Sequence, residues 1–154
     1  MTEEVYVGID PGLKGAIAVI AGDLVIIEDM PDTAKALDML KRDNVFECKT
    51  ALEQVHPLPG QSCIASFTYG GAYMLAYLLA KHFSKEPVLV SPQKWKKFYG
   101  LKKDPEETKT AYKRRSVDKA RELFPQAAEL LKYSKDGRAE ALLIANWLKA
   151  SDNS

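Results

Sequence analysis

The start of the chain alternates apolar residues with other residues at a period of two. Val5, Val7 and Ile9 fall on one side of an extended segment, as a half-buried strand requires. Two more runs rich in branched apolar residues follow, and Gly22-Asp23, a dipeptide suited to a tight turn, separates them. The pattern therefore predicts three strands joined as an antiparallel meander, at residues 5–10, 15–21 and 24–29.

Helical spacing begins after the meander. Ala36, Leu37 and Leu40 share one side of a helix expected over residues 32–42. A meander followed by strands that alternate with helices indicates an α/β fold, with a mixed central β-sheet and helices on both faces. The later elements are expected as a strand at 50–55, a helix at 71–83, a short strand at 88–90, a helical turn at 93–99, a basic helix at 108–123 and a last helix at 136–148.

Length and composition are those of an ordinary globular protein. The 154 residues fit one domain, and a content of 46% hydrophobic and 28% charged residues is typical of a folded chain. We expect one domain over residues 1–150 and a polar tail at 151–154.

No sequence feature predicts export or membrane contact. Apolar stretches such as 73–80 are shorter than the roughly 20 residues that span a bilayer, and Glu3 and Glu4 stand where a signal peptide would be basic. We therefore expect a cytoplasmic protein. Cys48 and Cys63 lack the spacing of zinc ligands, and we interpret both as reduced packing residues.

The net charge of +1 is divided unevenly along the chain. Residues 1–60 carry eleven acids against five bases, whereas residues 94–119 carry ten bases against four acids. This asymmetry favours a polyanion-binding surface in the second segment, and a solvated helix face is the alternative. The candidate DNA-binding residues of this segment are Lys96, Lys97, Lys102, Lys103, Lys109, Lys113 and Arg114.

Two acids stand on predicted strands. Asp10 ends the first strand, before a sharp turn at Pro11-Gly12, and a turn-initiating role is the alternative to a functional one. Glu53 lies within the apolar strand at 50–55, which we expect beside the first strand. Because a buried glutamate pairs or binds metal, Glu53 is a candidate site residue, with a solvated position on an edge strand as the alternative.

Two more acids lie one helical turn apart. Asp136 and Glu140 share the face of the last helix that packs on the sheet. The alternatives are a helix N-cap role for Asp136 and a rim position for Glu140, compensated by Arg138 or Lys135.

Four acids in one cleft repel one another unless a cation compensates them. Hard oxygen ligands select Mg²⁺, with Mn²⁺ as a substitute. Two such ions can activate a water, hold a scissile phosphate and stabilise the leaving 3′-oxygen. We therefore expect a two-metal phosphodiester hydrolase whose catalytic and metal-binding residues are Asp10, Glu53, Asp136 and Glu140.

Three segments together resemble the RuvC family of Holliday-junction resolvases, which includes smaller phage-encoded relatives. They are VGIDPG at 7–12, ALEQV at 51–55 and DGRAEALLIA at 136–145, and SPQKWKKFYGL at 91–101 is similar to the segment before the family's basic helix. The resemblance spans nearly the whole chain in the right order. One departure is that family members commonly have an aspartate where Glu140 stands, with the preceding acid three residues earlier, whereas Asp136 is four residues earlier.

The resemblance implies an RNase H-like fold, Mg²⁺-dependent nicking of four-way junctions in recombination and repair, and a homodimer. For a phage-encoded chain, the cytoplasm would be that of the host. It also implies that a loop at 66–70 approaches the junction centre, where Phe67 and Tyr69 would stack on opened bases. Core packing of these two aromatics is the alternative. The expected dimer surface is the helix at 71–83, with core packing of that helix within the monomer as the alternative; its apolar residues are Tyr73, Met74, Tyr77, Leu78 and Leu79.

Other functions fit parts of the pattern. The opening also resembles the phosphate loop of actin-like sugar kinases and chaperone ATPases, but those enzymes enclose ATP between two such domains, and this chain is too short for two. A broader branched-DNA or flap endonuclease and a catalytically silent junction-binding protein both remain alternatives to a four-way resolvase.

Overall fold

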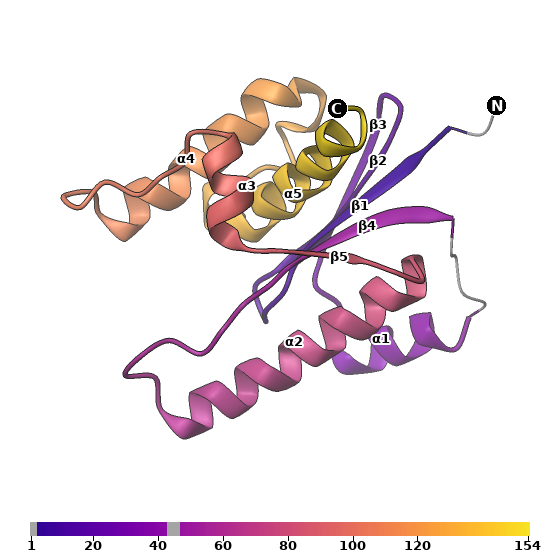
Figure 1. Cartoon of the computed structure of the whole chain (residues 1–154), viewed down its shortest axis with the longest axis horizontal. Helices are drawn as coiled ribbons and strands as arrows, with labels where there is room; N and C mark the ends of the chain where they lie inside the picture. The colour runs from indigo at the N-terminus through magenta and orange to yellow at the C-terminus, as the bar shows by residue number, and fades with distance from the viewer. Residues whose placement is uncertain (1–2, 43–46) are drawn as a thin grey trace.

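A five-stranded mixed sheet forms the centre of the protein (Figure 1). The computed structural model describes residues 3–42 and 47–154. The strand order is β3-β2-β1-β4-β5; β1, β2 and β3 pair antiparallel, while β1 with β4 and β4 with β5 pair parallel. The predicted meander and mixed sheet are thus confirmed. The strands are β1 Val5–Asp10, β2 Ala16–Ala21, β3 Leu24–Asp29, β4 Cys48–Glu53 and β5 Val88–Val90.

Helices cover both faces of the sheet, as predicted. Helices α1 and α2 lie on one face, and α3, α4 and α5 lie on the other (Figure 1). Two short 3₁₀ turns, Pro125–Ala127 and Tyr133–Lys135, connect α4 to α5. The α-helices are α1 Thr33–Leu40, α2 Cys63–Phe83, α3 Pro92–Phe98, α4 Lys109–Leu123 and α5 Asp136–Asp152.

Side-chain caps fix where the first four α-helices begin. Each cap oxygen accepts a hydrogen bond from the backbone N–H three residues further on, which satisfies a donor that the helix itself cannot pair. The four caps are Asp32, Ser62, Ser91 and Thr108.

Helix α2 begins eight residues before its predicted start. The Ser62 cap initiates it, and the segment 66–70, which we expected to be a loop, is helical. Gly70 and Gly71 lie inside this helix, where a glycine costs only about 1 kcal/mol relative to alanine. The full helix has 21 residues and is long and apolar enough by composition to cross a membrane, so the expectation that no apolar segment reaches this length was wrong. One side of α2 packs on β4 and α1.

Helix α5 continues to Asp152, four residues beyond its predicted end. The carboxylate of Asp152 accepts a hydrogen bond from the Tyr6 hydroxyl at 2.9 Å and pairs with Lys49. Ser151 and Asp152, which we predicted in a polar tail at 151–154, thus belong to the helix, and only the last two residues lie beyond it.

Helix α5 packs closely against β1 at Gly8. A Cβ atom added at Gly8 would overlap the carbonyl oxygen of Ala141 and the backbone nitrogen of Ala145. The two backbones thus lie against each other with no side chain between them. Around this contact, α5 buries Leu142, Leu143 and other apolar residues in the core.

We expect Gly8→Ala to destabilise the protein by about 3 kcal/mol, because the added methyl group displaces α5 from the sheet. Urea unfolding followed by circular dichroism measures the change. The matched control is Gly70→Ala on α2, where an added Cβ meets nothing within 4 Å. Equal unfolding free energies for the two variants would show that α5 can shift at no cost.

Candidate metal centre

Two acids stand at adjacent strand ends. Asp10 is the last residue of β1 and Glu53 the last of β4, and the parallel register pairs Ile9 with Leu52 just before them. Because side chains alternate along a strand, Asp10 shares the face of Gly8, which contacts α5, and Glu53 shares the face of Ala51, which packs in the same core. Both carboxylates therefore lie beneath α5.

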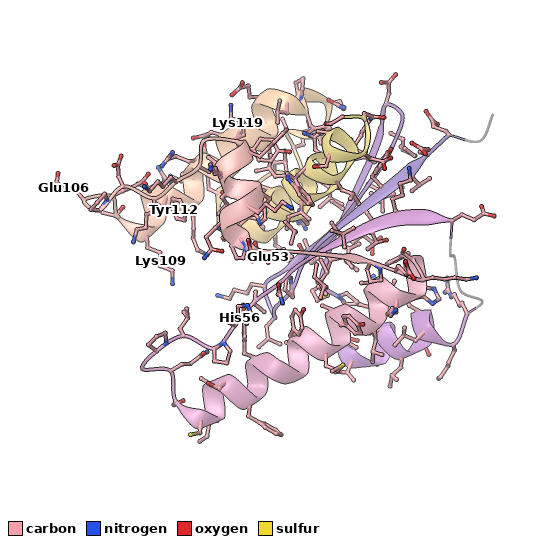
Figure 2. All side chains as sticks on the ribbon, viewed as in Figure 1. Glu53, His56, Glu106, Lys109, Tyr112 and Lys119 are labelled. Carbon is pink, nitrogen blue, oxygen red and sulfur yellow. The ribbon has the colours of Figure 1, made fainter. Side chains whose placement is uncertain are left out.

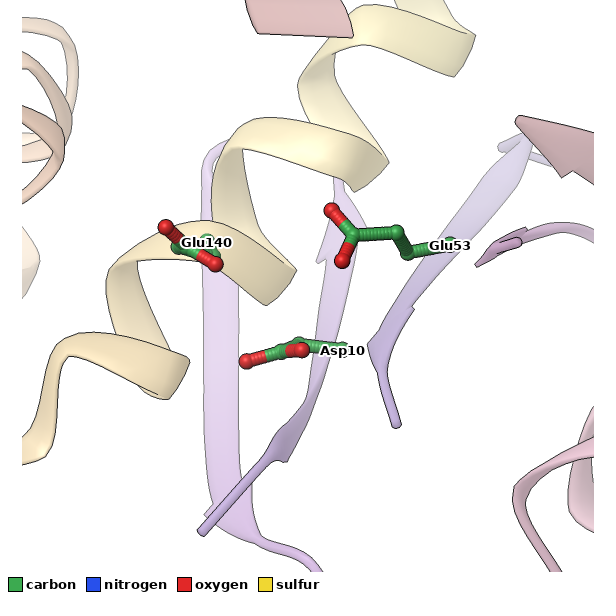
Figure 3. Close-up of side chains that lie close together, drawn as sticks. All are labelled: Asp10, Glu53 and Glu140. Carbon is green, nitrogen blue, oxygen red and sulfur yellow. The ribbon is translucent and has the colours of Figure 1, made fainter. Parts of the chain in front are cut away.

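A third carboxylate reaches them from α5. Asp10, Glu53 and Glu140 each offer a carboxylate oxygen, and these oxygens lie within 4.8 Å of one another (Figure 3). The first turn of α5 comes close because residue 137 is glycine. A Cβ atom there would overlap the carbonyl oxygen of Lys14 and lie 3.0 Å from an Asp10 carboxylate oxygen. Three hard oxygen donors at this spacing are suited to Mg²⁺ or Mn²⁺.

Glu53 is the most enclosed of the three, with 7% of its surface exposed. The indole Nε1–H of Trp95 donates a hydrogen bond to its Oε2 at 2.6 Å, which orients the carboxylate. Burial and the nearby charge of Glu140 raise the pKa of Glu53 to about 7, against the opposing effect of the Trp95 bond. Burial, followed by the charges of Glu140 and Glu53, also raises the pKa of Asp10. The cluster thus holds more negative charge than its surroundings compensate.

One lysine lies inside this cluster. The ammonium of Lys96, from α3, is 3.3 Å from Glu140 Oε1, and the side chain is only 16% exposed. It also lies 5.0 Å and 5.2 Å from the ring centres of Trp95 and Tyr112. Burial by itself lowers the pKa of Lys96, but attraction to Glu140 and Glu53 outweighs burial and raises it. Lys96 was predicted only as a DNA-binding residue, and its sequence position carries no signal of this contact.

Asp136 lies at the rim of the same cleft, outside the group of three. Its Oδ2 is 2.7 Å from the Lys113 ammonium, and its charge contributes to the raised pKa of Asp10. It does not cap α5, since the capping position belongs to Lys135 and no side-chain bond closes that end. Lys135 and Arg138, which the sequence offered as alternative partners of Glu140, both pair with Asp29 instead.

The carboxylates line a cleft of about 680 Å³ with residues from several elements. Tyr69 from α2 lines it, and burial together with the charge of Asp10 raises the tyrosine pKa. Lys109 and Lys113 line its opposite side, and Figure 2 shows Lys109 and Tyr112 on the same stretch of α4. Lys14 also lines the cleft; we did not predict it, although it follows Asp10 closely in the sequence.

The remaining predicted binding residues are placed differently. Phe67 is 86% exposed, so core packing does not account for it, and it borders an apolar groove that meets the cleft at Gly12 and Leu13. Arg114 stacks over the ring of Tyr133. Lys97, Lys102 and Lys103 line a second pocket, which shares Lys96 and Tyr112 with the cleft. Of the cysteines, Cys48 is half-buried but Cys63 is exposed, so the packing role predicted for Cys63 was wrong; neither forms a disulfide.

Comparison of the sequence with models of known protein families, and with curated proteins of known function, finds no match.

We expect Glu53→Gln to stabilise the metal-free protein at alkaline pH. The pKa of the Glu53 carboxyl is raised from 4.5 to about 7 in the folded chain, so the folded chain binds this proton more tightly than the unfolded chain does. Ionisation of Glu53 therefore begins to lower the free energy of unfolding as the pH rises above 4.5, and the loss is complete above pH 7. In EDTA, the variant should match the wild type near pH 4 and exceed it at pH 8 by on the order of 1–3 kcal/mol in unfolding free energy. Urea unfolding at both pH values measures the difference.

The exposed Glu129→Gln is the control, and it should leave the unfolding free energy unchanged at both pH values. If Glu53→Gln gives no stability gain at pH 8, the cluster does not strain the metal-free fold.

Proposed function

We propose that this chain is a Mg²⁺-dependent endonuclease of the RuvC type, with an RNase H-like fold, that resolves four-way DNA junctions by paired symmetric nicks. The observation that carries the proposal is the convergence of Asp10, Glu53 and Glu140 from β1, β4 and α5 within 4.8 Å. These are three of the four acids in the segments that resemble the family. The mixed sheet with helices on both faces is compatible with the proposed fold.

The donor set fits a divalent cation. Three carboxylates converge, two of them with raised pKa values, and within the described part of the chain Lys96 is the one base paired to a member of this group. Asp10, Glu53 and Glu140 would hold the metal, and Asp136 at the rim is a fourth candidate ligand for a second ion. Bound Mg²⁺ supplies an activated water and stabilises the leaving 3′-oxygen.

The protein residues contribute orientation and charge. Trp95 fixes the direction of the Glu53 carboxylate through its 2.6 Å hydrogen bond. Lys96, Lys109 and Lys113 place positive charge on the wall of the cleft, where it attracts the phosphates of a DNA strand. Phe67, exposed beside the cleft, is available to stack on an unpaired base near the branch point.

Substitution of the carboxylates tests the chemistry. In Mg²⁺, Asp10→Asn, Glu53→Gln and Glu140→Gln should each abolish nicking of a four-way junction, because each removes a metal ligand. Junction binding should persist, since less negative charge near a phosphate does not weaken attraction. We expect a large but smaller loss for Asp136→Asn. Gel mapping of nicks on four-way, flap and duplex DNA measures activity and substrate preference together.

The matched control is Asp38→Asn, an exposed acid on α1, which should retain full activity. Full activity in any of the three cluster variants would remove that residue from the mechanism. Preferential nicking of flaps indicates the broader branched-DNA endonuclease. Junction binding without nicking in Mg²⁺ or Mn²⁺ indicates a silent binding protein.

The proposed enzyme acts as a two-fold homodimer, because paired symmetric nicks require two active sites related by symmetry. Helix α2 offers the surface, with exposed apolar side chains at Ile64, Met74 and Leu78. Of the residues predicted for this surface, Leu79 is fully buried in the monomer core and is excluded.

Sedimentation at micromolar concentration should show a dimer, and Met74→Glu/Leu78→Glu should shift it to a monomer because two charges would be buried at the interface. Leu24→Glu, at an exposed position on edge strand β3, is the control and should leave the dimer intact. A wild-type protein that stays monomeric with and without junction DNA, yet makes paired nicks, would contradict the dimer.

A further inference from the structure

A second pocket lies beside the candidate metal centre, between α3, the start of α4 and the loop that joins them. Its volume is about 610 Å³, which is in the range of pockets that hold small organic ligands. Its lining includes four lysines and no acid. We call it the lysine pocket; the lysines are Lys96, Lys97, Lys102 and Lys103.

Three of the four lysines have free charges. Lys96 pairs with Glu140, but Lys97, Lys102 and Lys103 form no ion pair with any residue in 3–42 or 47–154, and all three are exposed. Three uncompensated ammonium groups around one hollow repel one another. An anionic ligand with more than one negative charge along its length would relieve that repulsion.

Arg115 holds the loop that carries Lys102 and Lys103, while Lys97 belongs to α3. The Arg115 guanidinium donates to the carbonyl oxygens of Gly100 and Lys102 at 3.1 Å and 3.0 Å, and it pairs with Glu107 at 3.0 Å. The charge of Arg115 is therefore compensated by Glu107 within the protein. Because the loop is already ordered, binding does not have to supply the free energy of ordering it.

The lysine pocket is continuous with the carboxylate cleft. Lys96 and Tyr112 line both, so a chain-like ligand that passes over the carboxylates can enter the lysine pocket without crossing another part of the surface. A phosphodiester backbone has the repeating charge that this arrangement requires. Lysine ammoniums act on phosphates as point charges, so such contacts position a strand without reading its sequence.

We propose that the lysine pocket binds the sugar-phosphate backbone of the cut strand on one side of the scissile phosphate, over one or two consecutive phosphates. The proposal rests on the proposed function and deepens it, since it assigns the strand a fixed path from the carboxylates toward the loop at 100–107. Arg115 is a positioning residue in this path, because it holds the lysine loop without facing the ligand.

The experiment measures binding and does not depend on cleavage. Four-way junctions carry one uncharged methylphosphonate at each phosphate within three nucleotides of the branch point, and affinity is measured in EDTA. For the wild type, we expect a loss of about threefold to tenfold at one or two consecutive positions and little change elsewhere. In the triple variant Lys97→Ala/Lys102→Ala/Lys103→Ala, the same methylphosphonates should cause no further loss of affinity, because the lysines that contact those phosphates are already removed.

The triple variant should also bind the unmodified junction about tenfold or more weakly at physiological salt, with a slope of log affinity against log salt reduced by about two to three. The matched control removes the same charge from helices on the opposite sheet face, in Lys35→Ala/Lys41→Ala/Lys81→Ala. Its affinity should stay within about twofold of the wild type.

Equal weakening in the two triple variants, or a wild type insensitive to every methylphosphonate, would overturn the proposal. Position-specific binding together with an absence of nicking in Mg²⁺ or Mn²⁺ would support the lysine pocket and contradict the nuclease. The two proposals therefore fail separately.

Discussion

The contact between α5 and β1 at Gly8 is the constraint on which the rest of the structure depends. No side chain separates the two backbones there, so α5 lies directly over the central strands. The carbonyl oxygen of Ala141 lies against Gly8, and Glu140 is the residue just before Ala141. The contact at Gly8 therefore fixes how far the Glu140 carboxylate lies from Asp10. One turn earlier in α5, Gly137 makes a similar close backbone contact with the carbonyl oxygen of Lys14, in the loop after β1. The same close packing that builds the core therefore assembles the carboxylates.

That assembly works against the stability of the metal-free protein. Burial raises the pKa of Asp10 and of Glu53, so ionising either group costs more in the folded chain than in the unfolded one. Trp95 and Lys96 each offset part of this cost, one by a hydrogen bond and one by charge. The compensation is incomplete, because among the described residues one partly buried ammonium, that of Lys96, faces three carboxylates. An arrangement that weakens the fold is expected at a site where a ligand supplies the missing charge, and a cation is the ligand that we propose.

Local patterns predicted the parts of the protein that local rules determine. Alternation located β1, and two runs of branched apolar residues around the Gly22-Asp23 turn located β2 and β3. The expected pairing of β1 with β4 was then enough to place Asp10 and Glu53 on neighbouring strands. Other features depend on packing between distant segments. Helical spacing puts Asp136 on the face of Glu140, yet Lys113 from α4 holds Asp136 at the rim. The start of α2 was missed because the family resemblance placed a loop at 66–70, whereas the Ser62 cap begins the helix at Cys63.

Charge along the sequence overstated how many bases can contact a polyanion. Residues 94–119 hold ten bases, but Lys96 and Lys113 face acids of the cleft, and Arg115 holds a loop. Arg114 lies over an aromatic ring, and the Lys119 ammonium is 3.0 Å from a carboxylate oxygen of Glu122. A count of residues cannot separate these roles, because an ion pair inside the protein and a free ammonium contribute equally to net charge. What distinguishes them is position: Lys97, Lys102 and Lys103, which have no ion pair among the described residues, lie around one pocket next to the carboxylates, where their charge would attract an anionic ligand that reaches the cleft.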